Sequence, residues 1–152
     1  MHVKFSPRGG CLAEIASQLD LARKSIYLLA YEFTADQVAQ ALVRAHSRGI
    51  AVHACLDHAA SCSRASQAHA LAAAGIAVWL DSQHHIAHNK VIIVDESLLM
   101  TGSFNYTENA EFNNAENLLV IPSCEVAQGY LANWQVHCSH SKPYSSAFAR
   151  PV

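Results

Sequence analysis

Blocks of apolar residues at two different spacings alternate along the first half of the chain. Apolar side chains recur at helical spacing after Cys11, and short continuous apolar runs bounded by turn residues follow. The pattern predicts strands at 2–5, 25–33, 50–56 and 76–80, and helices at 11–23, 35–47 and 59–74. Thr34 is predicted to cap the second helix, because its hydroxyl suits the first free backbone N–H groups.

The second half contains more strands and fewer helices. It predicts strands at 88–95, 98–101 and 116–121, a helical turn within 105–114, a helix at 124–137, and a loosely held tail over about 138–152. The first two of these strands are close enough in sequence to form a hairpin. We therefore predict one α/β domain over residues 1–152, with a mixed, largely parallel β-sheet flanked by helices on both faces.

Composition and charge narrow the class of protein. The chain has 152 residues and a mass of 16.5 kDa, and 51% of the residues are hydrophobic while 14% are charged. This excludes a disordered chain and favours one globular domain with its own core. The net charge of −2 is not that of a dedicated basic nucleic-acid binder. The five cysteines form neither a CxxC pair nor a zinc-binding spacing, so they do not indicate whether the protein works in an oxidising or a reducing compartment.

Membrane and export signals are weak in this sequence. The longest apolar stretch, residues 70–80, is much shorter than the roughly 20 residues that span a bilayer, so we expect no membrane insertion. Residues 1–10 lack the apolar core of a signal peptide. We therefore expect either a cytosolic protein or the processed form of an exported one.

Five polar side chains fall at the ends of three predicted neighbouring strands. His88 and Lys90 share one strand face, Ser103 and Asn105 follow a short strand, and Glu116 opens the next. A histidine is a nucleophile or proton shuttle, and a lysine with neutral hydrogen-bond donors suits a tetrahedral phosphate. A carboxylate can orient an imidazole by accepting its N–H. The set predicts a phosphoryl-transfer site that needs no metal.

These residues belong to a longer motif that resembles a known family. The sequence reads His88-x-Lys90-x4-Asp95-x6-Gly102-Ser103-x-Asn105, which is similar to the HKD motif of the phospholipase D superfamily. Chance matches to six such positions occur about once in 10⁷ starting points. The resemblance extends through most of the chain to the short, single-motif branch, the bacterial Nuc-type endonucleases and the Zucchini-type enzymes. It implies that Asp95 and Gly102 have structural roles.

The resemblance also implies a role for each polar side chain. His88 would be the nucleophile that forms a covalent phosphohistidine, and Lys90, Asn105 and Ser103 would hold the phosphate oxygens. Glu116 would orient the His88 imidazole. No cofactor is expected. Because this chain has one copy of the motif, the resemblance implies a homodimer in which two His88 residues face each other across a two-fold axis, one attacking and one acting as general acid.

The expected function is that of a metal-independent phosphodiesterase, a non-specific endonuclease acting on DNA or RNA. Two alternatives remain: phospholipase D-type hydrolysis of phospholipid headgroups, and a non-catalytic dimeric nucleic-acid-binding protein. Small bacterial members of the family are commonly exported, which favours the periplasm over the cytoplasm.

Two features of the sequence complicate this interpretation. His84 and His85 lie close to His88, so the three imidazoles are also candidates for a metal site. Glu32 ends a strand at the predicted active-site edge, where a carboxylate repels a polyanion unless Arg8 or Lys90 neutralises it.

Overall fold

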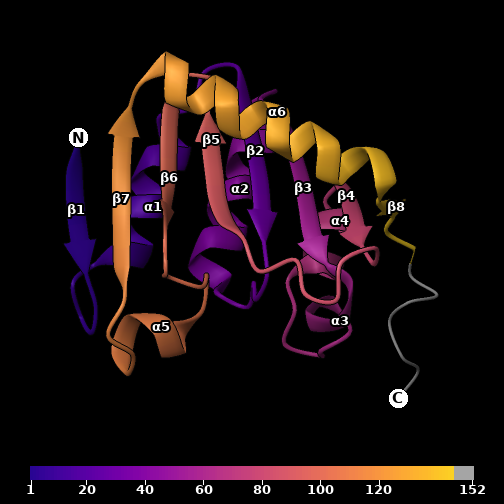
Figure 1. The fold of residues 1–152 in the computed structure, drawn as a ribbon, viewed down its shortest axis with the longest axis horizontal. Helices are drawn as coiled ribbons and strands as arrows, with labels where there is room; N and C mark the ends of the chain where they lie inside the picture. The colour runs from indigo at the N-terminus through magenta and orange to yellow at the C-terminus, as the bar shows by residue number, and fades with distance from the viewer. Residues whose placement is uncertain (146–152) are drawn as a thin grey trace.

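A single open sheet runs through the whole molecule (Figure 1). The computed structural model describes residues 1–145. In that range the strands are β1 (His2–Phe5), β2 (Ser25–Ala30), β3 (Ala51–Asp57), β4 (Ala77–Asp81), β5 (Lys90–Val94), β6 (Leu98–Gly102), β7 (Asn117–Pro122) and β8 (Lys142–Pro143). They lie in the order β1-β7-β6-β5-β2-β3-β4-β8. Strands β5 and β2, at the centre of the sheet, are almost entirely buried.

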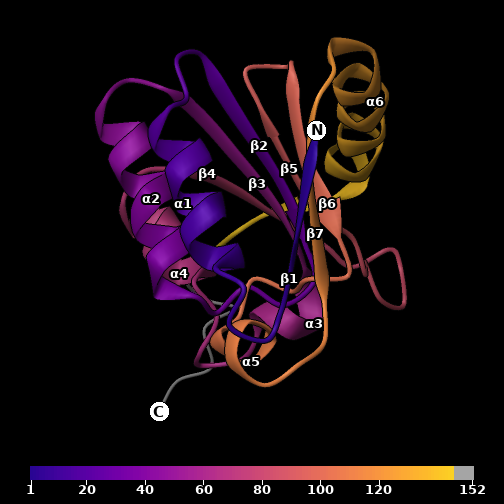
Figure 2. The ribbon, with the colours of Figure 1, turned by 90° about the vertical axis from the view of Figure 1, so that its left-hand side faces the viewer.

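Helices cover both faces of the sheet (Figure 2). The helices are α1 (Cys11–Asp20), α2 (Asp36–Ser47), α3 (His58–Ser61), α4 (Ala68–Ala73), α5 (Glu108–Phe112) and α6 (Cys124–His140). Helices α1, α2 and α4 pack on one face, where the larger core cluster lies, and α6 packs on the other. The indole of Trp134 on α6 donates a hydrogen bond to the Leu28 carbonyl at 2.8 Å, which ties this helix to β2.

The strand directions differ from the prediction in one respect. The prediction of a mixed sheet with helices on both faces is confirmed, but the expectation that it is largely parallel is wrong. Only the β2–β3 and β3–β4 pairs are parallel among the pairs of the described strands, and the others are antiparallel. The reason lies in the second half. A turn joins β5 to β6, and the connection from β6 to β7 contains the short helix α5, which stays at the lower end of the sheet in Figure 1. Neither connection crosses the sheet, so the chain reverses direction at each one.

Several element boundaries also differ. The helix predicted over 59–74 is two short helices, α3 and α4, separated by a turn. The strand predicted from His88 begins at Lys90. Thr34 does not cap α2: the N-cap residue is Ala35, and the backbone N–H groups of both residues donate to the Tyr106 carbonyl.

Part of the predicted tail is regular structure. Helix α6 continues to His140, and β8 then pairs with β4 and forms the edge of the sheet. The Ser141 hydroxyl donates to the His137 carbonyl at 2.7 Å, which closes the helix before β8 begins. The rest of the predicted tail, residues 146–152, lies outside the described residues. Within residues 1–145 no helix has both the length and the apolar character needed to cross a bilayer.

The directions of the strands place many strand ends, and the loops that follow them, at one edge of the sheet. Strands β2, β3, β4 and β6 end there, and β5 and β7 begin there. This is the lower edge in Figure 1, beside α3 and α5. Loops at the ends of a packed sheet are free to carry polar side chains, because they need not fill the core. The predicted site residues are attached to this lower edge, with the exception of Asp95.

Candidate active site

His88 lies at the lower edge, two residues before β5 begins, and it is exposed. The register of β2 against β5 pairs Ala30 with Lys90, which brings Tyr31 beside the imidazole. The ring centroids of Tyr31 and His88 are 4.7 Å apart. The tyrosine ring therefore restricts the orientation of the histidine while leaving it accessible to a ligand. Sequence analysis missed Tyr31, because its proximity depends on strand pairing across 57 positions of sequence (88 minus 31).

Lys90 is the buried cation of the site, with 7% of its surface exposed. Its Nζ donates a hydrogen bond to the His88 carbonyl at 2.7 Å and lies 5.3 Å from the Tyr31 ring centroid. Burial lowers the pKa of Lys90. The negative charge of Glu116, and to a smaller extent that of Glu32, raises the pKa again, but burial dominates and the pKa of Lys90 lies below its usual value. An ammonium has three N–H donors, so this geometry leaves donors for an anionic ligand.

Ser103 is fixed where β6 ends against the start of β7. Its hydroxyl donates to the Asn117 side-chain oxygen at 3.1 Å and accepts from the Asn117 backbone N–H at 3.0 Å. Gly102, which precedes it, has φ +152°, and a Cβ at this position would lie 2.2 Å from the Asn117 carbonyl oxygen. Only glycine allows this close approach of the two strands. The Gly102-Ser103 sequence thus has a packing role, whereas the phosphate-binding role of Ser103 stays a prediction.

Asn105 lies opposite Glu32 at the same edge. Its Nδ2 donates to Glu32 Oε2 at 3.3 Å, and its Oδ1 is buried without a hydrogen-bond partner among residues 1–145. The sequence suggested that Arg8 or Lys90 would neutralise Glu32, but within the same residues no ion pair joins Glu32 to either one. Glu32 instead accepts from the amide that is predicted to bind phosphate. A phosphate at this place would compete with the Glu32 carboxylate for Asn105.

Glu116 lies next to the first residue of β7, close enough to Lys90 for its charge to raise the lysine pKa. Its Oε1 accepts a hydrogen bond from the Asn114 side chain at 3.1 Å, and its backbone N–H donates to the Ser6 hydroxyl. Over residues 1–145, no hydrogen bond joins Glu116 to His88. The role of Glu116 in orienting the imidazole therefore stays a prediction.

Asp95 lies at the opposite edge of the sheet, after the last residue of β5. Its carboxylate accepts hydrogen bonds from the backbone N–H groups of Arg23, Lys24 and Ser25, at distances from 2.7 to 3.2 Å. It thereby fixes the chain at the start of β2, the strand that ends beside the site. This position supports the structural role that the motif implies and leaves Asp95 out of the chemistry.

The three clustered histidines do not converge on one point. His84 Nδ1 lies 2.9 Å from the carboxylate of Asp81, whereas the His88 ring lies against Tyr31. His85 is exposed on the loop between them. The two outer histidines therefore belong to different clusters, and a metal site made of all three is not what the structure shows.

Comparison with known proteins places the chain in a family. Residues 15–136 match the family model described as "Cardiolipin synthase, PLD-like domain". The chain is 45% identical over 130 residues to a protein named phospholipase D from Rickettsia bellii, covering 86% of this chain and 65% of that protein. It is 32% identical over 146 residues to the human mitochondrial cardiolipin hydrolase, covering 95% of this chain and 58% of that protein. The chain belongs to the phospholipase D superfamily.

A solved structure narrows the likeness within that superfamily. Nuc from Salmonella typhimurium, a phospholipase D family member, superimposes with a TM-score of 0.91 at 39% identity, covering 95% of this chain and 97% of that one. NucT from Helicobacter pylori shares the fold, with a TM-score of 0.84 at 24% identity over 94% of this chain and 100% of that one. The chain thus matches Nuc over nearly its full length, but spans about 65% of the length of the Rickettsia relative.

Proposed function

We propose that this protein is a phosphodiesterase that hydrolyses nucleic acid, and that His88 is its nucleophile. The observation that carries this proposal is that an exposed imidazole and a buried ammonium share one neighbour: the His88 ring lies 4.7 Å and Lys90 Nζ 5.3 Å from the centre of the Tyr31 ring, and Nζ donates to the His88 carbonyl. A buried lysine is costly unless it meets negative charge. A phosphate bound in front of His88 would supply that charge. The full-length likeness to Nuc supports a nuclease.

The proposed reaction has two displacements at phosphorus. A nitrogen of His88 attacks, an N–P bond forms, and the P–O bond to the leaving alcohol breaks as a general acid protonates that oxygen. Water then attacks the phosphohistidine, a base removes its proton, and the N–P bond breaks to free the imidazole. Throughout, Lys90 and Asn105 would stabilise the non-bridging oxygens, with Ser103 in support.

The general acid is proposed to be His88 of a second copy of the chain. This chain has one copy of the motif, so a second copy of the chain would supply the second motif histidine. The exposure of His88 at the sheet edge leaves room for a partner's His88 to approach across a two-fold axis. Attack and protonation then occur on opposite sides of the phosphorus, as in-line displacement requires.

The names of two relatives favour a second candidate substrate. The Rickettsia proteins are named phospholipase D, and the vertebrate relatives are named mitochondrial cardiolipin hydrolase. A phospholipid headgroup presents the same phosphodiester to His88 and Lys90. The chemistry of the site suits nucleic acid and phospholipid equally, so an experiment must distinguish between these two substrates.

The test is nicking of supercoiled plasmid by protein that has been stripped of metal and checked for its fold by circular dichroism. Nicking is expected to persist in excess EDTA, because the proposed nucleophile and electrostatic groups are all side chains. Vesicles of phosphatidylcholine or cardiolipin, added at equal phosphodiester concentration, are expected not to compete. Loss of nicking in EDTA by protein that keeps its fold and thermal stability contradicts metal independence, and release of headgroup without plasmid nicking overturns the nuclease proposal.

Replacing Glu32 with glutamine is expected to strengthen phosphate binding and to shift the alkaline limb of activity. Glutamine keeps an oxygen that accepts from Asn105 but removes the negative charge, so KM for a phosphodiester should fall about two- to fivefold. Glu32 raises the pKa of Lys90, so its removal lowers that pKa. Lys90 then loses its proton at lower pH as pH rises. The activity that needs its charge is therefore expected to disappear at lower pH than in the wild type.

The measurement is the pH dependence of kcat/KM for bis(p-nitrophenyl) phosphate. Glu125→Gln is the matched control, since it removes an equal charge from an exposed position in the first turn of α6, away from the site. An unchanged alkaline limb in Glu32→Gln, or an equal shift in both variants, would show that Glu32 does not act on Lys90.

A further inference from the structure

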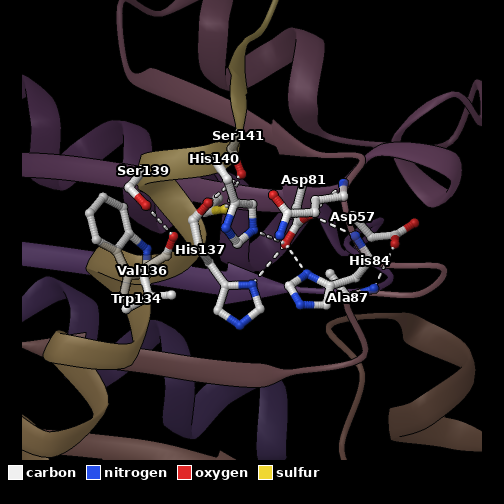
Figure 3. Close-up of polar contacts among 12 residues, drawn as sticks. Asp57, Asp81, His84, Ala87, Trp134, Val136, His137, Ser139, His140 and Ser141 are labelled. Atoms are coloured by element: carbon white, nitrogen blue, oxygen red, sulfur yellow. Dashed lines mark hydrogen bonds and ion pairs between the residues drawn. The ribbon is translucent and has the colours of Figure 1, made fainter.

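A second cluster of titratable side chains lies beyond the proposed active site, where β4 meets the end of α6 (Figure 3). The carboxylate of Asp81 is fully buried and faces three imidazoles. Its Oδ2 lies 2.9 Å from His84 Nδ1, 2.8 Å from His137 Nδ1 and 3.1 Å from His140 Nε2. Phosphodiester hydrolysis as proposed above uses none of these four side chains.

The other oxygen of Asp81 is used differently. Asp81 Oδ1 accepts from the backbone N–H groups of Gln83 and His84, at 3.0 and 3.3 Å. These bonds fix the carboxylate plane and direct Oδ2 toward the imidazoles. One carboxylate oxygen is therefore held by the backbone, while the other is surrounded by three nitrogen atoms, as Figure 3 shows.

The four donor atoms have the number and type that a tetrahedral metal ion needs. One atom each from Asp81, His84, His137 and His140 lies within 4.8 Å of all the others. A zinc ion with ligand bonds of about 2.0–2.1 Å separates its donor atoms by about 3.3 Å. The three oxygen–nitrogen distances must therefore widen by a few tenths of an ångström, and the nitrogen atoms must draw together. Rotation of His84, whose side chain is 45% exposed, allows this movement.

We propose that Asp81, His84, His137 and His140 form a Zn²⁺ site. Three imidazoles and one carboxylate favour zinc over Mg²⁺ or Ca²⁺, which prefer oxygen ligands throughout. To bind the ion, each neutral ring keeps its proton on the nitrogen that points away from Asp81, so that the facing lone pair is free. The Asp81 carboxylate offsets one of the two positive charges of the ion. The site has four protein ligands, which is typical of zinc sites that support structure.

The proposed ion would join three segments that are distant in sequence. Asp81 ends β4, and His137 and His140 lie on the last turns of α6. His84 lies near the start of the loop that leads from β4 to the proposed nucleophile. Asp57 already holds the far end of this loop, because its Oδ2 accepts from the Ala87 N–H at 2.9 Å. Zinc at His84 would hold the near end. The site is thus predicted to stabilise the α6 end and to fix the approach to the proposed active site.

The experiment titrates Zn²⁺ into tag-free, metal-stripped protein at pH 7.5, with a chromophoric chelator as competitor and thermal unfolding as a second readout. One equivalent is expected to bind with a Kd below about 1 µM and to raise the unfolding temperature. Co²⁺ in place of Zn²⁺ is expected to give the intense visible bands of tetrahedral coordination, without a thiolate charge-transfer band. The last point separates this site from the exposed thiols of Cys62 and Cys124.

His84→Gln is the informative variant, because the His84 side chain is partly exposed and the loss of its imidazole leaves the core unchanged. It is expected to weaken Zn²⁺ binding at least 100-fold, whereas His85→Gln, one residue along the same loop, should bind as the wild type does. Binding weaker than about 100 µM in the wild type would overturn the proposal. Equal binding by the two variants, or a thiolate band with Co²⁺, would also overturn it. None of these readouts depends on the nuclease assay.

Discussion

Replacing His88 with alanine is expected to lower the rate of phosphodiester hydrolysis by about 10⁴-fold or more. The variant has no nucleophile to form the N–P bond, and in the proposed dimer it also lacks the general acid. The measurement is kcat for bis(p-nitrophenyl) phosphate, with plasmid nicking beside it. Because the His88 side chain is exposed, its removal should change the free energy of unfolding by no more than about 0.5 kcal/mol.

The control for this variant is His69→Ala. It removes a different exposed imidazole, which lies on α4 and outside the lower-edge site. It should keep wild-type activity. Rapid quenching without acid should trap a phosphoryl group on His88 in the wild type. Full activity in His88→Ala would disprove the nucleophile. Active protein that sediments only as a monomer at the assay concentration would instead disprove the dimer and leave the nucleophile in place.

Replacing Asp95 with alanine is expected to lower the free energy of unfolding by about 3 kcal/mol. Three backbone N–H groups, those of Arg23, Lys24 and Ser25, lose their carboxylate acceptor. A hydrogen bond to a charged group contributes about 1.5–3 kcal/mol. Because two of these bonds are exposed, water replaces part of the stabilisation that the three provide together. Asp95 also has φ +52°, a left-handed conformation that aspartate tolerates better than alanine. Urea unfolding at pH 7 measures the change.

Asp95→Asn is the matched comparison. Asparagine keeps one oxygen acceptor for Lys24 and Ser25, and it also tolerates the left-handed conformation. It should cost less than half as much as alanine. An alanine variant within about 0.5 kcal/mol of the wild type would mean that the start of β2 does not depend on this carboxylate. In that case the structural role that the motif implies for Asp95 would have to be abandoned.

The separation between Asp95 and the lower-edge site illustrates how far a sequence motif can be interpreted. Spacing along a strand is local, because successive residues alternate between faces and advance by a fixed rise. The positions of His88 and Lys90 at the start of one strand, and of Ser103 and Asn105 after the next, therefore follow from the sequence, although His88 itself lies just outside β5. So does the opposite placement of Asp95, since β5 extends from the lower edge to the upper edge in five residues, Lys90–Val94.

Strand directions were the part that the sequence pattern did not determine. Helices between strands in the first half correctly indicated β2, β3 and β4 as parallel, but the same inference failed for the second half. Strand β5 follows β4 in sequence and yet inserts beside β2, antiparallel to it. Apolar periodicity shows which face of a strand is buried and carries no information about its neighbour. The choice of neighbour depends on how the whole sheet packs.

The sequence by itself determined the family, the alternation of elements and the residue types of the proposed active site, because each is written in local spacing. Only the tertiary structure decided which distant groups meet. It placed Tyr31 against His88, bonded Glu32 to Asn105, and gathered His137 and His140 around Asp81. The physical reason is that a contact between residues more than 50 positions apart arises from strand order and helix packing, which no local pattern specifies.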